Sequence, residues 1–381
     1  MLEKTESAPV NQPVIVAEPA KSNQPMWLRL LAGLGLTLVL AILAWLLTKK
    51  VYAVTLPFNI PGKVLEFPIW GALLGVAANL ILRPFKGNEF IRPGVRMEFF
   101  LKTGLVLLGA SINLKLLGTA AAGAVLQAPI MIASVFFFTY WLASRLGVEE
   151  KMRAVMSTAL AVCGVSAAIA AAGSVKAKKE QVTYIVTIVI LVALPLMVIA
   201  PLLAQAMHLT DGVAGAWFGG NIDTTAAVVG AGTIFSDTAQ KVASIVKNTQ
   251  NVFIGVVAFL LAIYFAARNE GGQRPGARMI WDRFPKFVLG FIAASILYTL
   301  GQMNGGVLGL IDGGKGTVLE ALKNWAFTLA FVAMGLEFAF GEIKSMGWRP
   351  LAVFLIATVF NTLLALGVSW VIFSYLLPIT F

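Results

Sequence analysis

Long apolar runs separated by short polar joins occupy the chain from Trp27 onward. A helix needs about 20 consecutive apolar residues to cross the hydrocarbon core of a bilayer. Eleven runs approach that length, at residues 27–48, 65–82, 98–116, 118–145, 154–174, 180–207, 212–235, 240–268, 284–303, 318–342 and 348–376. The pattern predicts an all-α polytopic transmembrane helical bundle with about 10–11 spans.

Three of these runs, 98–116, 154–174 and 212–235, are rich in Gly, Ala, Ser and Thr rather than in Leu and Phe. Small-residue segments are expected inside a bundle, where helices approach one another closely. Residues 1–26, by contrast, are polar and contain four prolines. The sequence therefore predicts a disordered N-terminal tail over 1–26, without a secretory cleavage site, and a transmembrane domain over 27–381.

The composition supports a membrane protein and narrows the function. Of the 381 residues, 59% are hydrophobic and 12% are charged, and this charged share is about half that of a soluble globular protein. With one cysteine, Cys163, the chain cannot form an intrachain disulfide. A metal site or a Ser/His/Asp triad would depend on the single histidine, His208. We therefore expect no enzyme activity, no metal site and no cofactor.

The formal net charge of +11 comes mainly from basic residues in the joins between apolar runs. This is the pattern of membrane proteins with Lys- and Arg-rich cytoplasmic loops, so no nucleic-acid partner is expected. The side that holds the N-terminus carries nearly twice as many basic residues as the other, which predicts a cytoplasmic N-terminus in a bacterial inner (plasma) membrane. Lys176, Lys178 and Lys179 fall on the minority side. These three lysines would lie on the more basic side if the segment 154–174 were broken or re-entrant.

Two segments resemble each other across the chain. The segment GLVLLGASINLKLLG at 104–118 and the segment AFVAMGLEFAFGEIK at 330–344 share an apolar run, a central glycine and an amphipathic exit. Many transporters are built from repeats with corresponding segments. Two apolar helices can also resemble each other by chance, so a repeat is one of two interpretations.

The first segment that could carry chemistry is Cys163-Gly164-Val165-Ser166, in the middle of an apolar run. Glycine weakens a helix by about 1 kcal/mol relative to alanine, and small polar residues let a helix unwind where it faces a cavity. One interpretation is a discontinuous helix whose backbone contacts a substrate. The other is a packing face of small residues in which Cys163 is a buried hydrophobe.

The second segment, at 216–232, combines a helix-breaking pair of glycines with residues that favour a helix start, namely Gly219, Gly220, Asn221, Asp223, Thr224 and Thr225. A half-helix that begins here would direct free N–H groups and partial positive charge into the bundle, which suits an anion. Ionised Asp223 would instead attract a cation, so it could carry a coupling proton or bind Na⁺. The alternative is an ordinary capped helix start in an exterior loop.

The third segment, at 243–255, places Lys247 and Asn251 on one helix face inside an apolar run. A lysine within the membrane costs about 3 kcal/mol, so it requires a partner or a wet cavity. Asp223 and an anionic substrate are the two candidate partners. Alternatively, Lys247 extends to the membrane interface, as is expected of Lys102.

The quoted residues resemble a family of bacterial membrane proteins, the YeiH-like sulfate exporters, from about Leu65 to Leu376. The matching segments are LKTGLVLLGASINL, AVCGVSAAIAA, and WFGGNIDTTAAVVGAG followed by SIVKNTQNVFIG. The chain departs from the family pattern at Asp223, Thr224 and Ala227, where a His, an acidic residue and a Gln are common. The resemblance implies inverted repeats with two broken, crossing helices, as in cation–proton antiporters and bile-acid symporters. The breaks would lie at 163–166 and 219–223.

These observations favour a secondary transporter that moves a small anion (sulfate, a sulfonate or an organic carboxylate), coupled to H⁺ or Na⁺. The candidate substrate-binding residues are Cys163, Gly164, Ser166, Gly220, Asn221, Thr224, Thr225, Lys247 and Asn251, with Asp223 as the ion-coupling residue. The alternative is a cation–proton exchanger in which Asp223 binds the cation. An intramembrane enzyme and a non-transporting assembly protein are less favoured. The expected partners are the anion, the coupling ion and the lipid bilayer, and a homodimer is one possible assembly.

Overall fold

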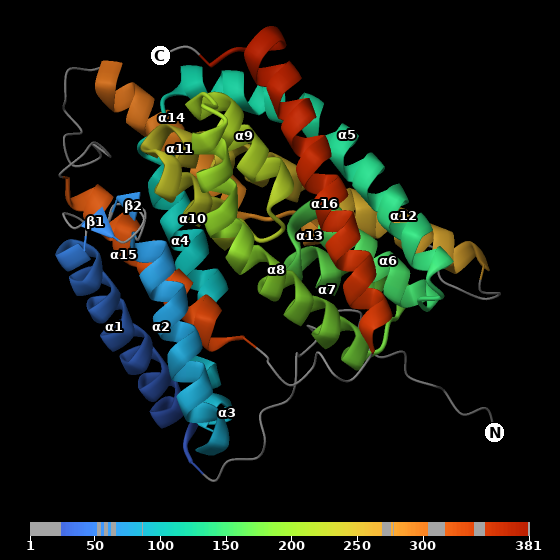
Figure 1. Cartoon of the computed structure of the whole chain (residues 1–381), viewed down its shortest axis with the longest axis horizontal. Coiled ribbons are helices and arrows are strands. Elements are labelled where there is room, and N and C mark those ends of the chain that lie inside the picture. The colour runs from blue at the N-terminus through green and yellow to red at the C-terminus, as the bar shows by residue number, and fades with distance from the viewer. Residues whose placement is uncertain are drawn as a thin grey trace.

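The computed structural model describes residues 24–51, 55–56, 60–61, 66–85, 87–268, 276, 278–303, 317–338 and 347–379. Figure 1 shows a bundle of helices with one small hairpin, in which β1 (Thr55–Leu56) pairs antiparallel with β2 (Ile60–Pro61). Within the described residues, seven helical stretches are long and apolar enough to cross a membrane. They are α1 (Met26–Val51), α2 (Phe67–Leu82) with the 3₁₀ turn Arg83–Phe85, α5 (Leu114–Arg145), α8 (Lys179–Ala206), α11 (Asp237–Val252) with α12 (Ile254–Arg268), α15 (Val318–Leu336), and α16 (Trp348–Trp370) with the π turn Val371–Leu376. The predicted polytopic helical bundle is confirmed.

Two further helices are shorter. α4 (Met97–Gly109) has 13 residues and is therefore about 20 Å long, less than the roughly 30 Å of a hydrocarbon core. α14 (Phe287–Met303) has 17 residues. Apart from two helical hairpins described below, the other short elements are α3 (Gly87–Ile91), the 3₁₀ turn Arg92–Gly94 and α13 (Arg278–Arg283). Buried Arg29 of α1 donates to the carbonyls of Glu89 (2.7 Å) and Phe90 (3.2 Å), and so holds the end of α3.

The segment predicted as span 154–174 is a re-entrant hairpin, which we call hairpin 1. It consists of α6 (Glu150–Thr158), a π turn (Ala159–Cys163) and α7 (Val165–Val175). The chain reverses at Gly164, where φ is 64°. Lys151 Nζ donates to Lys176 O at 3.2 Å, so the two ends of the hairpin lie together on one side of the bundle. This places Lys176, Lys178 and Lys179 on the same side as Lys151.

The segment predicted as span 212–235 is also re-entrant, and we call it hairpin 2. It consists of α9 (Asp211–Asn221) and α10 (Thr225–Phe235). α11 begins directly after α10. It runs parallel to α9, as the order of their contacts shows: Gly215 of α9 packs on Ala239, and Gly219 packs on Val246 further along both helices. The end of α10 therefore lies beside the start of α9.

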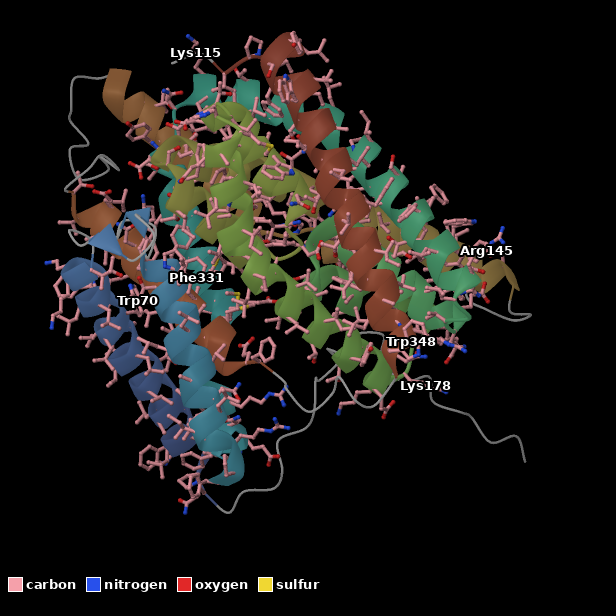
Figure 2. The ribbon with its side chains drawn as sticks, in the orientation of Figure 1. Trp70, Lys115, Arg145, Lys178, Phe331 and Trp348 are labelled. Atoms are coloured by element: carbon pink, nitrogen blue, oxygen red, sulfur yellow. The ribbon has the colours of Figure 1, made fainter. Side chains whose placement is uncertain are left out.

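The two hairpins enter the bundle from opposite sides. α8 connects them, and its 28 residues correspond to about 42 Å of helix. In Figure 2, Lys178 at the start of α8 and Lys115 at the start of α5 lie at opposite ends of the molecule. The eleven predicted runs thus become seven long helical stretches, two short helices and two hairpins within the described ranges. The first break occurs where predicted, at 163–166. The second lies at 222–224 instead of 219–223, because Gly219 and Gly220 continue α9. Each interrupted segment turns back instead of crossing.

The helices form two packed groups. In the first, α1, α2, α4 and α15 approach closely through glycines, and a Cβ on Gly75 of α2 would overlap the backbone of α15 at Val332. Asn79 of α2 donates to the carbonyls of Leu336 (2.6 Å) and Phe338 (2.7 Å), which caps the end of α15. The second group contains α5, α8, α11, α16 and both hairpins. α1 and α2 lie at one edge of Figure 1, and α5, α12 and α16 lie toward the other.

Two of the sequence predictions fall largely outside the described residues. The predicted disordered tail at 1–26 is described only from residue 24, and α1 begins at Met26. The second copy of the internal resemblance, 330–344, is described only as far as Phe338. Its described part belongs to α15, which packs against α4, the helix that carries the first copy: Phe327 of α15 contacts Gly104 of α4.

Candidate functional site

The tips of the two hairpins meet inside the second group of helices. A Cβ on Gly164, at the tip of hairpin 1, would lie 3.2 Å from the carbonyl oxygen of Asp223, at the tip of hairpin 2. Gly164 and Asp223 are both buried, and Asp223 is only 2% exposed. A glycine is required at position 164, because both the positive φ and the close approach disfavour a side chain. The structure therefore brings the two predicted breaks together.

Each tip ends in the N-terminus of a short helix. α7 begins at Val165 directly after Gly164, and α10 begins at Thr225. Thr224 caps α10, since its Oγ1 accepts from Ala227 N at 3.3 Å. The first N–H groups of a helix have no partner within the helix, and they carry partial positive charge. Two such termini therefore direct positive potential toward the junction of the tips.

The opposite arm of hairpin 1 ends in carbonyl groups that α11 caps. Lys247 Nζ donates to Val162 O at 2.7 Å, and Gln250 Nε2 donates to Ala161 O at 2.9 Å. Lys247 Nζ also donates to Gln250 Oε1 at 3.0 Å. Lys247 is 1% exposed. It therefore does not reach a membrane interface, and its ammonium is bonded to hairpin 1 and to its own helix.

The corresponding arm of hairpin 2 is held by α16. Asn361 Nδ2 donates to Asn221 O at 2.8 Å, and Thr362 Oγ1 donates to Asn221 Oδ1 at 2.9 Å. Trp217 Nε1 donates to Thr362 O at 3.0 Å. On the other side, Gln127 of α5 donates to Ala216 O at 3.1 Å. Asn361, Thr362 and Gln127 were not predicted from the sequence, although isolated polar residues in long apolar runs are a signal for such contacts.

Several buried polar atoms of hairpin 2 and α11 lack a hydrogen-bond partner. Asp223 Oδ2 has none, and neither do Asn251 Oδ1 and both polar side-chain atoms of Asn248. Asn251 Nδ2 donates to Thr225 Oγ1 at 3.3 Å, so the free oxygen of Asn251 lies at the start of α10. Buried polar groups are nearly always hydrogen-bonded. These atoms are therefore available to a solute, an ion or water.

Hairpin 1 also contacts the first group of helices through exposed polar residues. Ser166 Oγ lies 3.4 Å from Glu98 Oε1 of α4, and the two are hydrogen-bonded. Glu98 Oε2 forms an ion pair with Lys102 Nζ at 2.6 Å. A carboxylate thus lies beside the N-terminal turn of α7. Lys102 pairs with Glu98 on its own helix, at the boundary between the two groups.

Most of the predicted site residues converge. The residues at or next to the junction are Cys163, Gly164, Asn221, Asp223, Thr224, Thr225, Lys247 and Asn251. Ser166 faces α4, and Gly220 packs against Gln127 instead of facing the tips. Lys247 bonds to Val162 and Gln250 and does not bond directly to Asp223. The roles of these residues in substrate binding and ion coupling stay predictions.

The chain is similar to bacterial membrane proteins of one family. A family profile described as "Conserved hypothetical protein 698" matches residues 32–354. A UPF0324 membrane protein of Rhodopirellula baltica is 38% identical over 81% of this chain, and one of Nitratidesulfovibrio vulgaris is 36% identical over 81%. This chain spans 58% and 55% of the lengths of those two relatives.

A second UPF0324 membrane protein of Nitratidesulfovibrio vulgaris is 31% identical over 87% of this chain and 91% of its own length. No solved structure matches the chain. The resemblance to the YeiH-like family that the motifs suggested is confirmed. The family profile covers most of the chain, including both hairpins, and the relatives share its membrane character. The chain therefore belongs to the family described as "Conserved hypothetical protein 698", the UPF0324 membrane proteins.

Proposed function

We propose that this membrane protein is a secondary transporter that moves a small anion, such as sulfate, a sulfonate or an organic carboxylate. The observation that carries the proposal is the meeting of two re-entrant hairpins, with the N-termini of α7 and α10 at their tips. Interrupted helices whose N-termini point at anionic groups are a common way for transporters to bind a solute at mid-membrane depth.

The electrostatics of the tips suit an anion. The N-terminal N–H groups of α7 and α10 supply hydrogen-bond donors and partial positive charge. Lys247 adds a full positive charge directly behind hairpin 1, through its bond to Val162 O. Its hydrogen bonds are internal, so it acts on the solute through its field. The carboxylate of Glu98 accepts a hydrogen bond from Ser166 Oγ, so a negatively charged group already lies beside the N-terminal turn of α7.

Asp223 is proposed as the ion-coupling residue. Its Oδ2 is buried and has no hydrogen-bond partner, so it is available to take up a proton or to ligate Na⁺. A charged carboxylate at the tips repels an anionic solute, whereas a neutralised one does not. Binding of H⁺ or Na⁺ at Asp223 would therefore favour binding of the anion, which is the basis of coupled transport.

A second candidate function is cation–proton exchange. The observation that favours it is the set of unpartnered buried oxygens, Asp223 Oδ2 and Asn251 Oδ1. Hard cations take carboxylate and carbonyl oxygens as ligands. In this case Asp223 binds the cation and exchanges it for a proton, and Lys247 is its counter-charge.

The proposed location is a bacterial inner membrane with a cytoplasmic N-terminus. Hairpin 1 returns Lys176, Lys178 and Lys179 to the side of Lys151, so these lysines now support the basic side instead of opposing it. An excess of Lys and Arg marks the cytoplasmic side. A homodimer stays a proposal without a structural argument of its own.

The test is uptake of labelled sulfate, small sulfonates and carboxylates into proteoliposomes, with and without a pH or Na⁺ gradient. We expect gradient-driven uptake by the wild type and about a tenfold or larger loss in Asp223→Asn and Lys247→Ala, since interactions with charged groups are worth about 1.5–3 kcal/mol. Lys115→Ala, at an exposed position away from the tips, is the matched control. Absence of uptake of any anion, together with proton release on addition of Na⁺ or K⁺, would favour cation exchange instead.

A further inference from the structure

The ammonium of Lys247 fills an oxygen-lined position at the end of a helix. Because the chain reverses at Gly164, the last carbonyls of the π turn cannot all bond within the helix. Lys247 Nζ lies 2.7 Å from Val162 O and 3.0 Å from Gln250 Oε1. Both ligands are uncharged oxygens, and the negative end of the α6 helix dipole lies at the same place.

Uncharged oxygens hold the ammonium without a direct ion pair. Lys247 is 1% exposed, so water does not solvate its ammonium. The carboxylate of Asp223 is close enough to interact with it electrostatically, although the two are not hydrogen-bonded. Carbonyl and amide oxygens at a helix C-terminus, with a carboxylate nearby, are also the environment in which transporters coordinate small monovalent cations.

We propose that Lys247 is a tethered monovalent cation: its ammonium occupies a cation site at the end of hairpin 1, which a free ion from solution would otherwise fill. The site takes an ion of the size and charge of NH₄⁺ or K⁺. Lys247 is in this sense a positioning residue, because it holds the tip of hairpin 1 against α11. The inference stands on the local geometry and does not depend on which solute the protein transports.

One consequence concerns ion coupling. Since the chain itself supplies the cation at the end of hairpin 1, no Na⁺ from solution is required there. Any ion that drives transport then acts at Asp223. The wild type is therefore expected to be insensitive to the choice of monovalent cation at the Lys247 site, and a variant that empties this site is expected to become sensitive.

The test is the thermal denaturation of the full chain in detergent, measured by fluorescence-detected size exclusion. Lys247→Ala empties the site and leaves its oxygens in place, and Lys247→Met fills most of the space without a charge. Each is measured in NH₄Cl, KCl and NaCl against choline chloride at equal ionic strength. Because choline is too large for the site, it controls for general salt effects.

We expect NH₄⁺ to raise the denaturation midpoint of Lys247→Ala by about 2 °C for each tenfold increase above its Kd, and to leave the wild type and Lys247→Met unchanged relative to choline. Equal effects of all salts on Lys247→Ala, or an equal response of Lys247→Met, would overturn the proposal. So would failure to recover any monodisperse Lys247→Ala from membranes extracted in ammonium. Because denaturation requires no transport, the result is independent of the uptake measurements.

Discussion

At the scale of single residues, the junction of the two tips depends on groups that end helices. Gly164 allows the reversal of hairpin 1 with a φ of 64° and lets the backbone of Asp223 approach. Asn361 satisfies the end of α9 from a neighbouring helix. Gly164 thus permits the end of one helix, and Asn361 supplies a hydrogen bond that an uninterrupted helix would make for itself.

Replacement of Gly164 by alanine tests the reversal of hairpin 1. The left-handed backbone conformation and the overlap of a Cβ with Val189 disfavour any side chain, so we expect a loss of stability of about 1–3 kcal/mol together with loss of transport. Thermal denaturation and uptake measure the two effects. The control is Gly118→Ala, where a Cβ meets no atom within 4 Å. An unchanged denaturation midpoint in Gly164→Ala would contradict the described tip.

Replacement of Asn361 by alanine tests the attachment of hairpin 2 to α16. The change leaves Asn221 O buried without its donor at 2.8 Å, and an unsatisfied buried acceptor costs about 1–3 kcal/mol. We therefore expect a lower denaturation midpoint. Leu363→Ala on the same helix is the control, because Leu363 is 65% exposed and should change stability little. Equal stability of Asn361→Ala and the wild type would show that α16 does not hold the hairpin.

At the scale of elements, the sequence predicted the break at 163–166, and the lysines at 176, 178 and 179 raised a re-entrant path for this segment, but nothing in the sequence predicted that the segment 212–235 also turns back. The glycines and small polar residues around Gly164 and Asp223 disfavour a continuous helix, and this signal is local. Two half-helices of about ten residues each have the same length and hydropathy as one complete span. The direction of α7 after Gly164 depends on distant contacts, such as the bond between Lys151 and the carbonyl of Lys176.

The partners of the polar residues were also beyond the reach of the sequence. Lys247 was expected to face Asp223, an anion or the interface, but its ammonium bonds to Val162 and Gln250. The sequence gives no sign that the carbonyl of Val162 is the acceptor, since every residue has a backbone carbonyl. Asn361 looked like one polar residue in an apolar run, and only the packing of α16 against α9 gives it a role.

Cysteine labelling tests the re-entrant path of hairpin 1. In a background without Cys163, single cysteines replace Arg145, Lys178 and Lys115, which Figure 2 shows at the ends of the bundle. We expect an impermeant maleimide to label Arg145→Cys and Lys178→Cys from one side of oriented vesicles, and Lys115→Cys from the other. Labelling of positions 145 and 178 from opposite sides would mean that residues 150–175 cross the membrane once.

At the scale of the whole molecule, the two groups of helices contribute different residues to the proposed site. The first group, with α1, α2, α4 and α15, is joined by close glycine contacts and carries Glu98 and Lys102 toward the tip of hairpin 1. The second group contains both hairpins and their attachments to α11 and α16. In the proposed transporter, the solute binds where the tips of the second group face the first.

The most direct test of the central claim is anion exchange in proteoliposomes, because exchange requires the binding site but no driving ion. Vesicles loaded with unlabelled sulfate, sulfonate or carboxylate receive the labelled anion outside. We expect exchange by the wild type and by Asp223→Asn, accumulation under a gradient by the wild type alone, and neither by Gly164→Ala. Absence of exchange of any anion by the wild type, with proton release on addition of Na⁺ or K⁺, would contradict the anion transporter.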